Sequence, residues 1–152
     1  MQPIGEILVN SQVVSCGASA TVYEACKAMH EAKIGAVLVL SEEGVALGIF
    51  TERDLLSRVV IPSLDPKDVP VGTVMTRGVF TVTPTEKASD VRREMTRRHI
   101  RHVPVVDGGE IKGILSLRDL LKADLSEQKR EVEAITTYIQ GGFEPPEDLR
   151  EG

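Results

Sequence analysis

The chain repeats itself once. Residues 25–56 return, with many identities and conservative changes, as residues 91–121. Met29 corresponds to Met95, 66 positions later, and the offset falls to 65 by the end of the repeat, so the second copy is one residue shorter. Units this small bury little core alone, so we expect the two copies to pack against each other. Two like units packed in this way form a pseudo-twofold cleft, which is a natural ligand site.

The composition fits one compact body of 152 residues. Hydrophobic residues make up 41% of the chain but aromatic residues only 3%, so the core must be built from aliphatic side chains. The formal net charge of -5 argues against a general nucleic-acid coat. No apolar run approaches the roughly 20 residues that span a bilayer, and the N-terminus lacks a secretory pattern. We expect a cytoplasmic protein without membrane contact, in which Cys16 and Cys26 are free thiols.

Each copy predicts the order β-α-β-β-α. The first extended segments are 13–16 and 79–82, where β-branched residues dominate. In the first copy Thr21 and Glu24 have the spacing of a helix capping box, whereas Lys87 stands at the matching position of the second copy. A helix is predicted to begin directly after Thr21 and after Lys87.

Two apolar strands, joined by a turn, follow each helix and lead to a second helix. The strands are predicted at 36–40 and 47–50, and at 103–106 and 112–115. A further helix is predicted at 126–140, with Val132, Ile135 and Ile139 on one face. The expected organisation is a first repeat at 1–65, a second repeat at 66–125, and a C-terminal helix with a flexible acidic tail at 126–152.

Each second helix is expected to begin with a hydroxyl residue that is followed, three positions later, by an acid. These pairs are Thr51 with Asp54 and Ser116 with Asp119. Free backbone N–H groups at a helix start suit an anion such as phosphate, and a carboxylate can accept hydrogen bonds from the paired hydroxyls of a ribose. The same spacing is also a helix-capping signature. The residues alone leave both interpretations open.

The ordered set of motifs over residues 7–125 resembles a tandem of cystathionine-β-synthase-type (CBS) domains, also called a Bateman module. The matching elements are Thr21-Val22-x-Glu24-Ala25-x-x-x-Met29, Ile34-Gly35-Ala36-Val37-x-Val39, the two Ser/Thr-x-x-Asp pairs and Val74-Met75-Thr76. The resemblance implies an α/β (α+β) fold in which two β-α-β-β-α repeats pack face to face about a pseudo-twofold axis. It also implies a stand-alone regulatory module that is not an enzyme.

The resemblance further implies an adenosine ligand between the repeats. AMP is the first candidate, followed by ATP, ADP, NAD(H) and S-adenosylmethionine, and no metal is expected. The acids of the two pairs would hold ribose, and Arg101 with His102 would meet phosphate. The residues assigned to the ligand are Thr51, Asp54, Ser116, Asp119, Arg101, His102, Arg118, Val79, Val82 and Ala36. Because the first copy has Gly35 and Ala36 where the second has Arg101 and His102, two unequal sites are predicted.

Two other functions stay open. The basic segment from Arg92 to Arg101 could bind nucleic acid, although it lacks interleaved aromatic residues and also fits a solvated helix face. Alternatively, the chain could be a structural dimerisation module with empty pockets. The resemblance implies a homodimer of tandem repeats and an unidentified client protein as partners, and the helix at 126–140 could serve either contact. No GxSxG, GxxxxGK[ST] or GxGxxG motif occurs.

Overall fold

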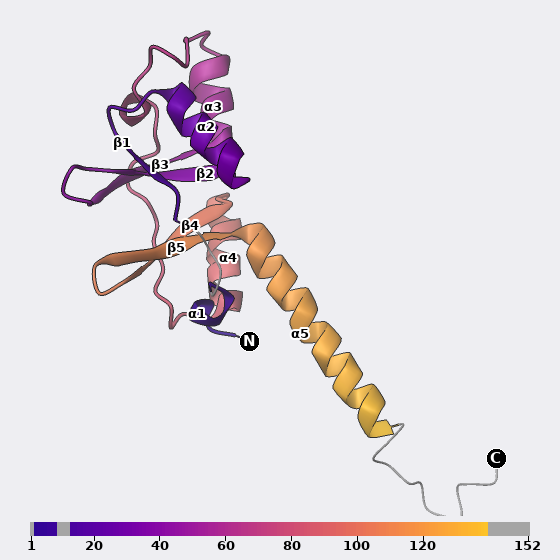
Figure 1. The fold of residues 1–152 in the computed structure, drawn as a ribbon. Helices are drawn as coiled ribbons and strands as arrows, with labels where there is room; N and C mark the ends of the chain where they lie inside the picture. Colours follow the sequence, from indigo (N-terminus) through magenta and orange to yellow (C-terminus); the bar gives the residue numbers. More distant parts are fainter. Residues whose placement is uncertain (1, 9–12, 140–152) are drawn as a thin grey trace, which may run out of the picture.

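Each copy of the repeat folds around its own small sheet. The computed structural model describes residues 2–8 and 13–139, and its two repeats lie one beside the other (Figure 1). In the first sheet β1 (Ser15–Gly17) runs parallel to β2 (Ala36–Leu40), which pairs antiparallel with β3 (Ala46–Thr51). In the second sheet β4 (His102–Asp107) pairs antiparallel with β5 (Glu110–Ser116). The predicted strand pairs are therefore present in both copies.

The second copy lacks a full counterpart of β1. The extended segment predicted at 79–82 forms a single parallel bridge, between Val82 and Val105. The Val82 N–H donates to the Pro104 carbonyl at 3.1 Å, and the Val106 N–H donates to the Val82 carbonyl at 2.8 Å. The next position that would donate to β4 is Pro84, which has no N–H, and the Thr83 N–H donates to the side chain of Glu86. The chain therefore turns away from the sheet, which shortens the predicted segment to one paired residue.

The first helix of each repeat presents a matching apolar face to the core. In α2 (Val22–Ala32) the predicted capping box between Thr21 and Glu24 is formed, whereas α4 (Ala88–Arg98) begins after Lys87 without a side-chain cap. Both helices end at a residue in the left-handed region, Lys33 and His99. Their buried residues are Val22, Ala25 and Met29 in α2, and Ala88, Val91 and Met95 in α4.

Each core also takes in residues from outside its own repeat motif. The helix α1 (Ile4–Ile7) contributes the fully buried Ile4 to the second core, and its Ile4 N–H donates to the Glu86 carbonyl at 2.9 Å. The 3-10 turn η2 (Val71–Thr73) begins a segment that contributes Val71, Val74 and Met75 to the first core. The repeats are thus interlocked by their flanking segments. The limits predicted for them, 1–65 and 66–125, stay a prediction.

The second helices of the two repeats differ greatly in length. The helix α3 (Glu52–Leu55) passes into a π-helical turn, η1 (Leu56–Val60), which ends just before Pro62. In contrast, α5 (Leu117–Thr137) is one helix of 21 residues that extends away from both repeats (Figure 1). The helix predicted at 126–140 is present as far as Thr137, but it is the end of α5 and not a separate helix, because no Gly or Pro interrupts the chain from Leu117 to Thr137. The end predicted for this helix at residue 140 and the predicted tail lie outside the described residues.

None of the described helices has the length and apolar character needed to cross a membrane.

Candidate functional site

Both hydroxyl–acid pairs form capping boxes at helix starts. The Thr51 N–H donates to Asp54 Oδ2 at 3.0 Å, and the Asp54 N–H donates to Thr51 Oγ1 at 3.3 Å. The second copy repeats this exchange, since the Ser116 N–H reaches Asp119 Oδ2 and the Asp119 N–H reaches Ser116 Oγ, both at 3.0 Å. Helix capping is therefore one role of each pair. The two carboxylates differ in what else they contact.

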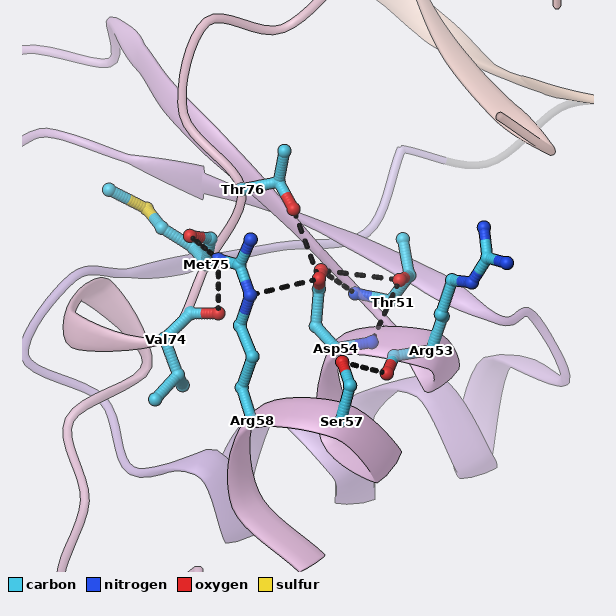
Figure 2. Close-up of polar contacts among 8 residues, drawn as sticks. All are labelled: Thr51, Arg53, Asp54, Ser57, Arg58, Val74, Met75 and Thr76. Carbon is cyan, nitrogen blue, oxygen red and sulfur yellow. Dashed lines mark hydrogen bonds and ion pairs between the residues drawn. The ribbon is translucent and has the colours of Figure 1, made fainter. Parts of the chain in front are cut away.

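The Asp54 carboxylate is engaged on both oxygens (Figure 2). Thr51 Oγ1 donates to Oδ2 at 3.2 Å, and Thr76 Oγ1 donates to Oδ1 at 3.0 Å. Arg58 adds an ion pair, with Nε 3.8 Å from Oδ1, while its Nη1 donates to the carbonyls of Val74 and Met75. The residue is only 7% exposed. Asp54 therefore bonds the segment that follows the first repeat to the start of α3.

Asp119 is more open than Asp54. It is half-buried, and the hydrogen bonds that tie it to a described side chain or through its own carboxylate are the two that it exchanges with Ser116. Its second oxygen, Oδ1, accepts no hydrogen bond from any described residue. An exposed carboxylate oxygen at a helix start can accept hydrogen bonds from a ligand without displacing a protein group. Asp119 can therefore accept a ligand hydrogen bond at Oδ1, whereas both oxygens of Asp54 already have protein partners.

His102 lies where the two repeats meet. It pairs with Ser116 in the β4–β5 ladder, and its imidazole lies 3.4 Å from the position that a Cβ would take on Gly35. That same position is 3.2 Å from the Glu52 carboxylate. Burial lowers the pKa of His102, whereas the negative charges of Glu52 and Asp119 act to raise it. The imidazole is therefore surrounded by the start of α3 from one repeat and the start of α5 from the other.

The other residues assigned to the ligand are spread over different environments. Arg101 and Arg118 are exposed, and Val79 is half-buried. Val82 and Ala36 are buried, so neither side chain offers open surface. The structure therefore brings together His102, Asp119 and Ser116, while Val82 and Ala36 offer a ligand almost no accessible surface.

The family model for the CBS domain matches the chain twice, at residues 4–61 and at residues 71–126. The chain belongs to the CBS-domain family. The predicted resemblance and the predicted fold of two CBS repeats are therefore confirmed. A mitochondrial CBS domain-containing protein of Arabidopsis thaliana, CBSX3, is 35% identical over 132 residues, which are 84% of this chain and 64% of that protein. The chain thus spans less than two thirds of this relative.

Solved structures of CBS-domain proteins share the fold over most of the chain. A protein with CBS domains from Burkholderia ambifaria MC40-6 is 32% identical, with a TM-score of 0.79 over 84% of this chain and 96% of the other. A CBS domain protein from Pyrobaculum aerophilum, complexed with AMP, is 29% identical, with a TM-score of 0.70 over 77% of this chain and 88% of the other. The chain is a CBS tandem module, and these proteins are named for CBS domains rather than for an enzymatic activity.

Several residues that shape the CBS site were not assigned from the sequence. Thr76 and Arg58 hold Asp54, while Glu52 and Gly35 adjoin His102. Thr76 was visible as the last residue of the Val74-Met75-Thr76 motif, but that motif gave it no role. Among residues 2–8 and 13–139, no three His, Cys, Asp or Glu side chains are grouped as a metal site requires.

The basic segment on α4 of the second CBS repeat is largely paired with acids. Arg92 contacts Asp124 at 2.8 Å, Arg93 lies 3.8 Å from Asp90, and Arg97 and Arg98 both bind Glu94. These two arginines lower the pKa of Glu94 to about 2 through their hydrogen bonds. Each internal pair reduces the charge that is available to phosphates, so the arrangement favours a solvated helix face over a nucleic-acid surface.

Proposed function

We propose that this CBS tandem module is a regulatory protein that binds an adenine nucleotide, AMP first, where its two repeats meet. The observation that carries the proposal is the unengaged Oδ1 of Asp119, at the start of α5 and close enough to His102 to influence its charge. A carboxylate oxygen in this position suits the hydroxyls of a ribose. The AMP complex of the related Pyrobaculum aerophilum protein supports the choice of ligand class.

The phosphate of the nucleotide is assigned to Arg101 and His102. Arg101 is exposed and His102 is half-buried at the beginning of β4, where His102 pairs across the ladder with Ser116 of the Asp119 capping box. Both side chains can donate charge-assisted hydrogen bonds to a phosphate when His102 is protonated. In this proposal ATP, ADP, NAD(H) and S-adenosylmethionine are the alternative ligands. The site needs no metal and performs no catalysis.

The matching site at Asp54 is proposed to be the weaker of the two. A ribose there would have to replace Thr76 or Arg58 as a partner of the carboxylate, and each displaced group would lose a hydrogen bond or an ion pair. The first repeat also has Gly35 and Ala36 in place of the basic residues. Both differences weaken ligand binding at the Asp54 site, so the two sites are unequal.

Regulation would follow from the position of the ligand. A nucleotide between Asp119 and the start of α3 contacts both repeats, so it stabilises one arrangement of the repeats over others. A client protein, or a second copy of the module in a homodimer, would respond to that arrangement. A cytoplasmic location remains part of the proposal, and the Arabidopsis relative is named as mitochondrial.

Isothermal titration calorimetry with AMP, ADP, ATP, NADH and S-adenosylmethionine tests the proposal. The informative variant is Asp119→Asn, which keeps an oxygen for the Ser116 N–H but removes the charge. We expect it to weaken AMP binding by roughly 10- to 150-fold, because the ribose would lose hydrogen bonds to a charged group. Asp107→Asn, at the exposed end of β4, is the matched control and should bind AMP as the unmodified protein does. Equal affinity of Asp119→Asn and the unmodified protein would refute the ribose assignment, and an absence of heat with all five compounds would favour a structural module.

A further inference from the structure

The helix α5 carries an apolar stripe along its length. Its first turns pack on the second repeat through the buried Leu120 and the pair Arg92–Asp124. Beyond them the helix extends away from both repeats (Figure 1). Large apolar side chains along α5 and just beyond its end are between 47% and 65% exposed, namely Leu121, Leu125, Val132, Ile135 and Ile139. The part of α5 beyond Asp124 ends at Thr137, and an isolated helix this short is marginal in water, since helices gain most of their stability by packing an apolar face. The stripe therefore indicates a packing partner.

The spacing of the stripe is that of a coiled coil. Together with Gln128, the apolar positions advance in alternating steps of four and three residues. In heptad notation the a positions are Leu125, Val132 and Ile139, and the d positions are Leu121, Gln128 and Ile135. From residue 121 to residue 139 this seam is about 27 Å long at 1.5 Å per residue.

The charged side chains beside the stripe indicate which partner it binds. Lys122 and Lys129 occupy e positions, and Asp124 and Glu131 occupy g positions. When two copies of α5 lie parallel, Asp124 of each copy faces Lys129 of the other. When they lie antiparallel, the two copies of Lys129 face each other, and so do the two copies of Glu131. Arg92 holds Asp124 through Oδ2, which leaves Oδ1 for the lysine. Charge complementarity therefore favours a second copy of this chain in the parallel orientation.

We propose that α5 pairs with α5 of a second copy as a parallel coiled coil over residues 121–139. The pairing buries the stripe of both copies and continues from the point where α5 leaves the second repeat. Gln128 would meet its own copy in the middle of the seam, where a polar residue fixes the register at some expense in stability. The inference does not depend on nucleotide binding, since none of its residues belongs to the proposed nucleotide site.

Disulfide cross-linking of full-length protein tests the pairing and its orientation. Leu121→Cys is introduced in a Cys16→Ala/Cys26→Ala background and oxidised at micromolar protein concentration, without nucleotide. Parallel pairing brings the two copies of residue 121 together, whereas antiparallel pairing separates them by about 27 Å. We expect a covalent dimer. Adding Ile135→Asp should abolish it, whereas adding Ala134→Asp, which puts the same charge on the outer face of the same turn, should not.

Sedimentation equilibrium of the chain without engineered cysteines gives an independent measure. Ile135→Asp should raise the dimer dissociation constant by at least about 100-fold, because each dimer loses two buried isoleucines and gains two facing carboxylates. Ala134→Asp should leave it within about threefold. Circular dichroism checks that both variants keep their folded repeats. A monomeric unmodified chain, or cross-linking that is equal in the Ile135→Asp and Ala134→Asp proteins, would overturn the proposal and leave the stripe to a different protein or to residues 140–152.

Discussion

Thr76 donates a hydrogen bond from its hydroxyl to Asp54 Oδ1 at 3.0 Å, across 22 residues of chain. The same threonine pairs with Ile49, with the Thr76 N–H donating to the Ile49 carbonyl at 2.8 Å and the Ile49 N–H donating in return at 3.0 Å. The segment that leaves the first repeat is therefore bound both to β3 and to the start of α3. This contact makes Asp54 a structural residue in a way that Asp119 is not.

Replacing Asp54 should reduce stability. Asp54→Ala removes the acceptor for Thr51 and Thr76 at a buried position, so we expect a loss of about 1.5–3 kcal/mol in the free energy of unfolding. Thr76→Val removes only one of these hydrogen bonds and should lose about 0.5–1.5 kcal/mol. Urea unfolding monitored by circular dichroism measures both values. If Asp54→Ala were no less stable than Thr76→Val, the carboxylate would not be the centre of this network.

Gly48 should tolerate no side chain, because the segment containing Thr76 crosses β3 at this residue. A Cβ on Gly48 would lie 2.5 Å from the Thr76 carbonyl oxygen and 2.8 Å from Met75 Sδ. Gly48→Ala must displace one of them, and we expect it to lower the free energy of unfolding by about 1–3 kcal/mol. Gly17→Ala is the control, since a Cβ there meets no atom within 4 Å. Thermal unfolding of the two variants compares them, and equal melting temperatures would contradict the close approach.

The repeat order, the Thr21 capping box and the apolar helix faces could be predicted because each is a local pattern. A capping box joins residues three apart, and the face around Met29 follows from helical periodicity. The assignment of Thr51 and Asp54 to one helix start was correct for the same reason. The family could be predicted because these local patterns recur in one order in both copies.

The long-range features could not be predicted in this way. The contact of Thr76 with Asp54 depends on how the segment after the first repeat returns across β3, which no spacing in the sequence encodes. The contribution of Ile4 to the second core is likewise a tertiary contact. The pairing of Val82 with Val105 is also a tertiary contact, although its end is marked by Pro84, which has no N–H to continue the ladder. In contrast, the continuity of α5 was readable from the absence of Gly and Pro between residues 117 and 137.

His102 should make stability fall in acid. Burial holds the pKa of folded His102 below the ordinary value of about 6.5 that applies in the unfolded chain. Well above pH 6.5 the imidazole of His102 is neutral in both the folded and the unfolded chain. The contribution of His102 to stability is then fully present. As the pH falls through 6.5 the unfolded chain binds the proton first, so stability is lost until the folded pKa is reached.

Unfolding by urea at pH 7.5 and at pH 5.5 measures this effect. His102→Gln should show a smaller loss between the two pH values than the unmodified protein. His30→Gln, on the exposed side of α2, serves as the control and should retain the loss. An unchanged pH dependence in His102→Gln would mean that burial of the imidazole is not its source.

The pair Arg92–Asp124 should fix α5 against α4 more strongly than an ordinary surface pair would. Its atoms are 2.8 Å apart, and its side chains are 34% and 21% exposed, against 46% and 77% for Lys112 and Glu110. Partial burial reduces solvent screening, so a double-mutant cycle of Arg92→Ala and Asp124→Ala should give a coupling of about 1 kcal/mol. The cycle of Lys112→Ala and Glu110→Ala should give about 0–0.5 kcal/mol. Equal couplings, measured by urea unfolding, would show that Arg92 does not anchor the helix and that the packing of Leu120 alone holds it.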